Sequence, residues 1–282
     1  MLKSKFSKCF LIVLCLFVSV NVFALTWAEL KAQIEAKYSS FSDEVNDMEM
    51  VMEAETKAME GMQGPGPSEI KMFRKGNKYR MEMKMSMPEG AGMPAGMGDM
   101  TNIMIFDGKD LWSVNQFAGK TKIEADADAA KGDQMNWWKD MPENGKIIGS
   151  EKIGDKDCYV VEAWDIDTSS IKTGEENKIK GWIEKGTLLL IQSEFRGAKD
   201  ETFKAVNSNF QKVEKWELPY TTEIYTGGKL ITKTAIKTLK INQGLSDELF
   251  DADKVKVETK GIPGMPGIPG MEGMMEKFKQ GQ

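Results

Sequence analysis

The chain has 282 residues and is mildly acidic, with 43 acidic and 38 basic side chains and a net charge of −5. This balance argues against nucleic-acid binding, and the absence of histidine from the sequence removes the usual general base and the commonest metal ligand. GxSxG, phosphate-loop and CxxC motifs are missing as well, so we expect neither an enzyme nor a bound cofactor or conventional metal centre.

The first 24 residues have the composition of a secretory signal peptide. Three lysines precede an apolar run over residues 10–20, and Val22 and Ala24 occupy the −3 and −1 positions of a small-residue cleavage site. The run is short for a membrane span, and an uncleaved anchor is the alternative. We expect residues 1–24 to be a signal peptide that is cleaved during export, which leaves a soluble protein in the periplasm.

A helix is expected directly after the cleavage site. The segment from Thr26 to Glu29 has the pattern of a capping box, with Thr26 as the N-cap and Glu29 reaching back to it. Apolar residues then recur at helical spacing, at Trp27, Leu30, Ile34 and Tyr38. This pattern predicts an amphipathic helix of about three turns.

Beyond residue 47 the apolar period changes from that of a helix to that of a strand. Residues 70–74 and 79–87 form two arms about a turn at 75–78, and a second hairpin over 102–115 turns at Asp107-Gly108. Further strand patterns lie at 48–54, 147–153, 158–165, 179–184, 188–195, 203–216, 221–225 and 231–241. Consecutive strands with short connections predict an antiparallel meander. We assign residues 25–258 to one domain.

Three segments interrupt this rhythm. Residues 126–138 are expected to form a helix or an irregular lid that carries Met135, Trp137 and Trp138. Residues 88–99 are rich in Gly, Met and Pro, which is typical of a mobile loop. Residues 259–282 repeat Gly, Ile, Pro and Met, and we expect a disordered tail there.

Methionine is unusually frequent, with 21 residues, most of them between Met48 and Met104. Its unbranched, polarizable side chain suits apolar ligands of variable shape. On the expected strands the methionines either line a cavity for an acyl chain or fill a core. In the loop, thioethers are soft ligands that select Cu(I). The loop methionines that could converge on such an ion are Met87, Met93, Met97 and Met100; the alternative is a flexible insertion.

Three short segments together resemble a known family. Residues 106–117 read FDGKDLWSVNQF, residues 74–80 read RKGNKYR, and KINQGL at 240–245 precedes DELF at 247–250. In this order, after a signal peptide and a helix, they resemble LolA and its LolB-like outer-membrane lipoprotein-sorting relatives over residues 26–255.

The resemblance implies a mainly β fold of the α+β type. It is an incomplete antiparallel β-barrel, or half-barrel, with an N-terminal helix and a lid helix or loop over its open side. Relatives shelter lipoprotein acyl chains between the sheet and the lids, or sense lipids. The implied partners are an acyl lipid or lipoprotein and an envelope membrane protein as donor or acceptor.

Site residues follow from the resemblance and the strand patterns. The expected cavity lining is Met50, Met52, Met81, Met83, Phe106, Leu111, Trp112 and Phe117. The covering elements would contribute Trp27, Ile34, Trp137 and Trp138. In the carrier a basic residue on the first hairpin helps to hold the lid closed. Here Arg74 and Lys75 lie at that turn, and Lys75 is the nearer match in position, although it is not an arginine.

The expected function is therefore a periplasmic lipid- or lipoprotein-binding carrier that shelters acyl chains in an apolar half-barrel. A Met-rich periplasmic Cu(I)-binding protein is one alternative. An envelope lipid sensor or scaffold, whose tail recruits a partner, is another.

Overall fold

The computed structural model describes residues 25–57, 66–86, 99–124, 138, 141–164, 178–197 and 201–256. The expected signal peptide, nearly all of the Gly/Met/Pro loop, the expected lid apart from Trp138, and the C-terminal tail lie outside these ranges. Within them, no helix is long and apolar enough to cross a membrane.

One long helix, thirteen strands and a short 3-10 helix make up the described elements. The helix α1 spans Trp27–Glu44, and the 3-10 helix η2 spans Asp247–Phe250. The strands are β1 (Asp47–Thr56), β2 (Ser68–Lys75), β3 (Lys78–Met85), β4 (Met100–Phe106), β5 (Leu111–Asn115), β6 (Gly119–Ile123), β7 (Asn144–Ile153), β8 (Lys156–Trp164), β9 (Ile179–Glu184), β10 (Leu190–Arg196), β11 (Thr202–Val213), β12 (Trp216–Thr226) and β13 (Lys229–Ile241).

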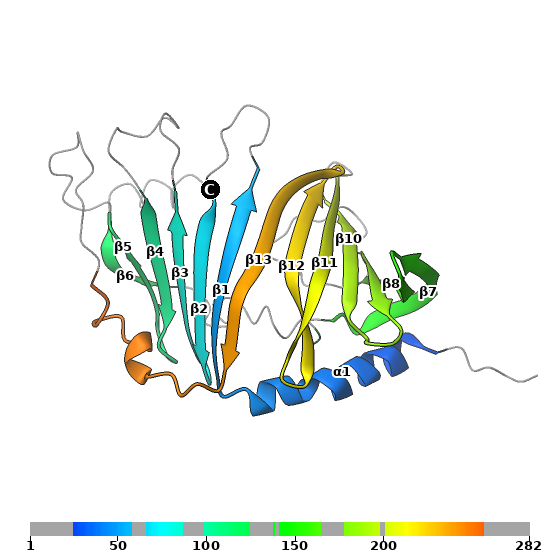
Figure 1. The fold of residues 1–282 in the computed structure, drawn as a ribbon, viewed down its shortest axis with the longest axis horizontal. Coiled ribbons are helices and arrows are strands. Elements are labelled where there is room, and N and C mark those ends of the chain that lie inside the picture. Colours follow the sequence, from blue (N-terminus) through cyan, green and yellow to red (C-terminus); the bar gives the residue numbers. More distant parts are fainter. Residues whose placement is uncertain are drawn as a thin grey trace, which may run out of the picture.

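All thirteen strands form one sheet, in the order β6-β5-β4-β3-β2-β1-β13-β12-β11-β10-β9-β8-β7. The chain runs outward from β1 to β6, crosses to the opposite edge at β7, and returns to β13, which pairs with β1 (Figure 1). Each neighbouring pair is antiparallel, so the predicted meander is confirmed. Because β6 and β7 do not pair with each other, the sheet stays open, as a half-barrel requires.

The predicted capping box is present at the start of α1. The Glu29 backbone N–H donates to Thr26 Oγ1, and the Thr26 backbone N–H donates to Glu29 Oε2. The helix has 18 residues, or about five turns rather than the three expected. The apolar stripe extends beyond Tyr38 to Phe41, whose burial holds the additional turns against the sheet.

Two strand boundaries also differ from the sequence pattern. The turn between β11 and β12 falls at Glu214, which has a left-handed φ of 56°, and β12 continues through Pro219, where a break was expected. Proline disturbs a ladder least at a free strand edge, and β12 pairs with β13 only from Thr221 onward. The short strand β6 was not expected.

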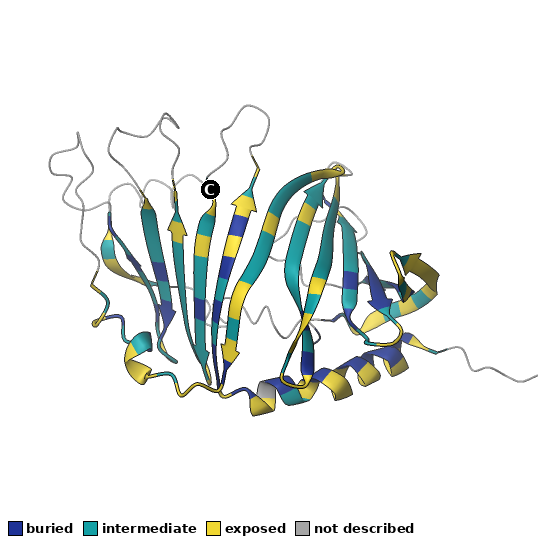
Figure 2. Ribbon diagram, in the orientation of Figure 1, coloured by how far each residue is buried: buried dark blue, intermediate teal, exposed yellow. Residues whose placement is uncertain are grey.

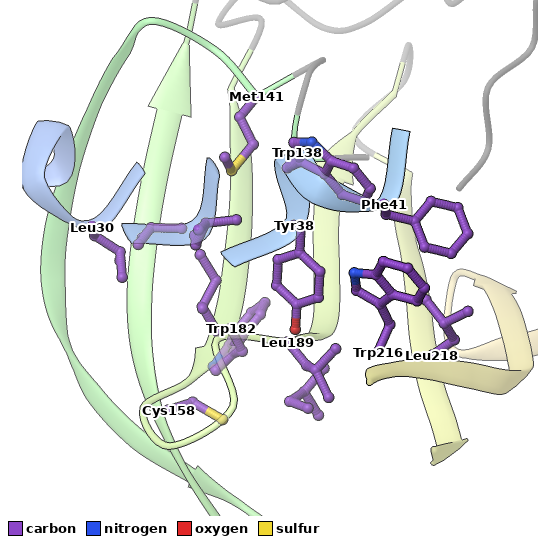
Figure 3. Packing of buried hydrophobic residues seen from close by; sticks show 14 of the residues in the cluster. Leu30, Tyr38, Phe41, Trp138, Met141, Cys158, Trp182, Leu189, Trp216 and Leu218 are labelled. Carbon is purple, nitrogen blue, oxygen red and sulfur yellow. The ribbon is translucent and has the colours of Figure 1, made fainter. Parts of the chain in front are cut away.

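The largest group of buried apolar side chains lies where α1 meets the sheet (Figure 3). Phe41 and Trp216 pack edge to face with their ring centroids 5.1 Å apart, and Tyr38 stacks on Trp138 at 5.5 Å. Met48 of β1 and the directly opposite Ile241 of β13 belong to the same group. We call the face of the sheet that carries them, and on which α1 packs, the inner face.

The outer face of the first hairpins is covered by the chain that follows β13. Phe250 of η2 is buried against Ile103 and Ile105 of β4 and Val114 of β5. Arg80 Nη1 donates to the Leu249 carbonyl at 2.9 Å and so fixes this segment to β3. Burial alternates along β1 (Figure 2). Most of its inner-face side chains are buried and most of its outer-face side chains are partly or fully exposed, as expected for a strand whose two faces have different environments.

Candidate lipid-binding face

A row of methionines crosses four adjacent strands on the inner face. Met50 of β1 lies directly opposite Met72 of β2, Met72 lies opposite Met81 of β3, and Met81 lies opposite Met104 of β4. On the other side, Met50 faces Leu239 of β13. Alternation along each strand puts all these side chains on one face. We call the four methionines the central methionine row.

Parallel rows flank the central methionine row. In the strand register, one flanking row contains Ile236, Met52, Ile70, Met83 and Asn102. The other contains Ile241, Met48, Arg74, Tyr79, Phe106, Leu111 and Ile123. Six of the eight residues predicted to line the cavity are therefore brought together: Met50, Met52, Met81, Met83, Phe106 and Leu111.

The inner face is apolar and partly covered. Met50, Met52 and Met72 are only 1%, 7% and 8% exposed, whereas Met81 and Met104 are half-buried. The three buried methionines form one cluster, with Met81 packed against it. The methionines of β1 and β2 are therefore buried, while those of β3 and β4 are more exposed. Together they form an apolar surface that can adapt its shape.

Charge is almost confined to the outer face of these hairpins. Over the described residues of β1–β6, register and alternation place Arg74 as the one charged side chain on the inner face. Its Nη2 donates to the carbonyl of Val45, the C-cap of α1, at 3.3 Å. Arg74 therefore links β2 to the end of the helix.

Tyr79 of β3 and Asn102 of β4 are polar members of the two flanking rows, and Ser113 of β5 lies directly opposite Met104. Burial raises the pKa of the Tyr79 phenol above its ordinary value, so the hydroxyl stays protonated and can donate a hydrogen bond. Asn102 Oδ1 accepts from Ser113 Oγ at 3.2 Å. An apolar surface with a few polar groups at its border is typical of sites for small apolar ligands.

Two predicted lining residues lie elsewhere. Trp112 is paired with Ile105 and points to the outer face, where Lys120 Nζ lies 4.9 Å from its ring centroid. Its Nε1 donates to Asp107 Oδ2 at 3.2 Å. Phe117 lies in the turn between β5 and β6 and is half-buried. We leave both residues out of the proposed site.

The predicted covering residues gather over the other half of the sheet. Trp27 and Ile34 of α1 and Trp138 are buried in the cluster where α1 meets β7–β12, and Trp27 Nε1 donates to the Pro142 carbonyl at 3.1 Å. Trp137 lies outside the described residues. This cluster reaches the flanking row at Met48 and Ile241, but it is separate from the cluster of Met50, Met52 and Met72.

Lys75 lies on the outer face, opposite in orientation to Arg74. Its Nζ contacts the Leu245 carbonyl at 2.8 Å and Asp247 Oδ2 at 3.0 Å, so it holds the segment that leads into η2. Of the two basic residues at this turn, Arg74 is the one that contacts the helix. Lys75 is not included in the proposed site.

Sequence reasoning missed several inner-face residues. Ile70 and Met72 alternate with Lys71 and Phe73, and this pattern could have identified them. Met104 could have been found in the same way, from its alternation with Ile103 and Ile105. By contrast, Ile236 and Leu239 come from β13 and join the face only through its pairing with β1.

Comparisons with known proteins agree with this architecture. A family model described as "Uncharacterized protein" matches residues 127–256. No curated protein matches the chain. A DUF1329 family protein from Desulfovibrio piger superposes with a TM-score of 0.55 and 15% identity, over 81% of this chain and 97% of the other.

A second solved structure is a putative outer membrane lipoprotein-sorting protein domain from Vibrio parahaemolyticus. It superposes with a TM-score of 0.54 and 13% identity, over 80% of this chain and 96% of the other. At these identities the likeness concerns the fold alone. The predicted fold, an incomplete antiparallel β half-barrel with an N-terminal helix, is confirmed.

Proposed function

We propose that the inner face of β1–β5 binds the acyl chain of a lipid or lipoprotein in the periplasm. The observation that carries this proposal is the central methionine row, which joins four strands into one uncharged apolar surface. Methionine has three rotatable side-chain bonds and fits ligands of variable shape, which suits chains of different length and saturation.

Burial of the chain would supply most of the binding free energy. Each methylene removed from water contributes about 0.8 kcal/mol, so a long acyl chain gains affinity without any directed contact. Tyr79 and Asn102 at the border are suited to hydrogen-bond an ester or amide group of the ligand. An envelope membrane protein as donor or acceptor is part of the same proposal.

Export and lack of catalysis complete the proposal. The periplasmic location is supported by the signal-peptide pattern of residues 1–24. A binding role without chemistry is supported by the absence of histidine from the sequence and of the nucleophile motifs. Release would then require a change in the cover or a better acceptor, and no covalent step.

Two measurements test the proposal. Lipids extracted from protein purified from the periplasm should contain acyl species by mass spectrometry, and the purified protein should bind a fluorescent fatty acid. The double variant Met81→Gln/Met104→Gln places two polar amides in the half-buried part of the row and should weaken that binding.

Val51→Gln is the matched control, because Val51 lies between Met50 and Met52 on β1 but points to the outer face. It should bind the fatty acid like the unaltered protein. Repeated absence of extracted acyl lipid together with no fatty-acid binding would overturn the proposal. Equal losses in the double variant and the control would show that the methionine row is not the binding surface.

A further inference from the structure

We propose that Met50, Met72 and Met81 together form a Cu(I)-binding site made of three thioethers. They come from three neighbouring strands, each directly opposite the next, and they pack in one apolar cluster. This site differs from one built on Met87, Met93, Met97 and Met100, of which only Met100 lies within the described residues. It shares its three methionines with the proposed lipid-binding face, but copper binding does not require that a lipid binds there.

The strand spacing allows the three sulfur atoms to converge. Neighbouring strands lie about 4.8 Å apart, and each methionine can redirect its sulfur through three rotatable bonds. Met72 is the central member, because it faces Met50 on one side and Met81 on the other. Met81 is half-buried while its two partners are buried, so the ion would enter from the β3 side.

The surroundings favour a soft monovalent ion over harder metals. Thioethers are neutral soft ligands that select Cu(I), whereas Mg²⁺, Ca²⁺ and Zn²⁺ need oxygen, imidazole or thiolate groups. Across the described residues, no cluster of three or more His, Cys, Asp and Glu side chains could hold such an ion. Ile70, Ile236 and Leu239 pack around the methionines and would shield the ion from water.

The pH dependence of Cu(I) binding distinguishes thioether ligands from a thiol ligand. A thioether has no proton to lose, so its Cu(I) affinity should not change between pH 5 and pH 7, in contrast with a thiol ligand. Cys158 is buried in the cluster at α1, and burial raises the pKa of its thiol. The methionine site therefore predicts Cu(I) binding that does not depend on pH and survives Cys158→Ser.

Methionine and leucine have nearly the same volume, so Met→Leu keeps the packing and removes the ligand atom. The test titrates the full-length mature protein, without oxygen, against a chromophoric Cu(I) chelator. Loss of a residue that only supports a metal ligand typically lowers metal affinity by about tenfold. Met72→Leu removes a ligand itself, so it should lower the Cu(I) affinity by at least about tenfold. Met50→Leu/Met72→Leu/Met81→Leu should lose the site.

Met85→Leu/Met100→Leu is the matched control, because these two methionines face each other on the same face at the far end of β3 and β4. It should keep the Cu(I) affinity. Fatty-acid binding is measured separately on the unaltered protein, so that a missing copper site is distinguishable from a failed lipid proposal. X-ray absorption of the copper complex should show sulfur neighbours.

Three results would overturn the proposal. One is absence of Cu(I) binding that competes with the chelator. Another is a Cu(I) affinity that the triple variant leaves unchanged. Loss of that affinity when Met87, Met93 and Met97 are replaced by leucine would then assign copper to those methionines. The last is a Cu(I) affinity that falls as the pH is lowered from 7 to 5 and that is lost in the Cys158→Ser variant.

Discussion

Met72 and Met81 lie directly opposite each other across the β2–β3 hairpin, with both side chains on the inner face. Met72 is buried and Met81 is half-buried, so the pair spans the change from packed core to accessible apolar surface. This relationship connects stability with binding, because the residues that would hold a ligand also hold the first hairpins to β1 and β13.

Met72→Ala should destabilise the protein by about 2–5 kcal/mol, because it removes a buried side chain and leaves a cavity between β1 and β3. The neighbouring Lys71 points to the outer face, where it is half-buried and its Nζ lies 3.3 Å from Glu69 Oε1. Lys71→Ala should therefore change stability by less than about 0.5 kcal/mol. Denaturant unfolding of both variants measures the difference, and equal effects would contradict the assigned faces.

Phe41 should anchor the last turns of α1. Its side chain is 1% exposed and packs edge to face on Trp216. Phe41→Ala should cost about 3–5 kcal/mol by cavity formation and loss of the ring pair. Gln33→Ala, at an exposed position of the same helix, is the control. Chemical denaturation followed by tryptophan fluorescence reports both; a stable Phe41→Ala variant would mean that α1 ends its packing at Tyr38.

The capping box predicts a pH-dependent contribution to stability. The Thr26 backbone N–H and then its hydroxyl, which both donate to Glu29, hold the pKa of Glu29 below its ordinary value of 4.5. A carboxylate with a lowered pKa in the folded protein contributes stability above its unfolded pKa, and this is lost as the pH falls through the folded value. Glu29→Gln should therefore be destabilising at pH 7 and nearly neutral at pH 3.

Thermal unfolding of the unaltered protein and Glu29→Gln at the two pH values measures this difference. Gln33→Ala, at an exposed position of the same helix, removes no titratable group and should have the same effect at both pH values. A Glu29→Gln effect of equal size at pH 3 and pH 7 would refute the electrostatic origin.

Asp47 should hold the segment that leads into η2. This carboxylate is 4% exposed and accepts hydrogen bonds from the backbone N–H groups of Gln243, Gly244 and Leu245, at 2.8, 2.8 and 3.2 Å. Asp47→Ala leaves these three donors without their acceptor, which should cost about 3 kcal/mol.

Hydrogen exchange shows where that loss appears. Amides of residues 243–252 should exchange faster in Asp47→Ala, because Phe250 loses its anchor on the outer face, while β8–β10 keep their protection. Glu49→Ala, on the outer face of the same strand and 3.9 Å from Lys240, is the control. Uniform acceleration throughout the sheet would show a global effect and not a local clamp.

Much of the fold was accessible from local pattern. The capping box set the start of α1, period-two alternation marked most strands, and turns such as Asp107-Gly108 set the hairpin limits. Errors arose where burial overrode local signals. Phe41 extended the helix through Ser39 and Ser40, and the turn at Glu214 lacks the glycine that usually marks a left-handed residue.

Only part of the candidate site could be predicted from local sequence pattern. Alternation alone shows that Met50 and Met52 share a face, and that Met81 and Met83 do so, because side chains on one strand repeat every second residue. Whether the two pairs share one face depends on register, since a shift of one residue turns a strand over. Leu111 and Trp112 are adjacent on one strand and cannot share a face, and register decides that Leu111 faces the methionines.

The sequence by itself therefore determined the class of the fold, the start of the helix, the hairpins and the absence of histidine-based chemistry, because each depends on residues close together in the chain or on composition. Only the tertiary structure decided that Met50, Met72, Met81 and Met104 form one row and that β13 closes against β1. It also decided that Arg74 reaches α1 while Lys75 holds the C-terminal segment. These are pairings between distant segments, and backbone register sets them.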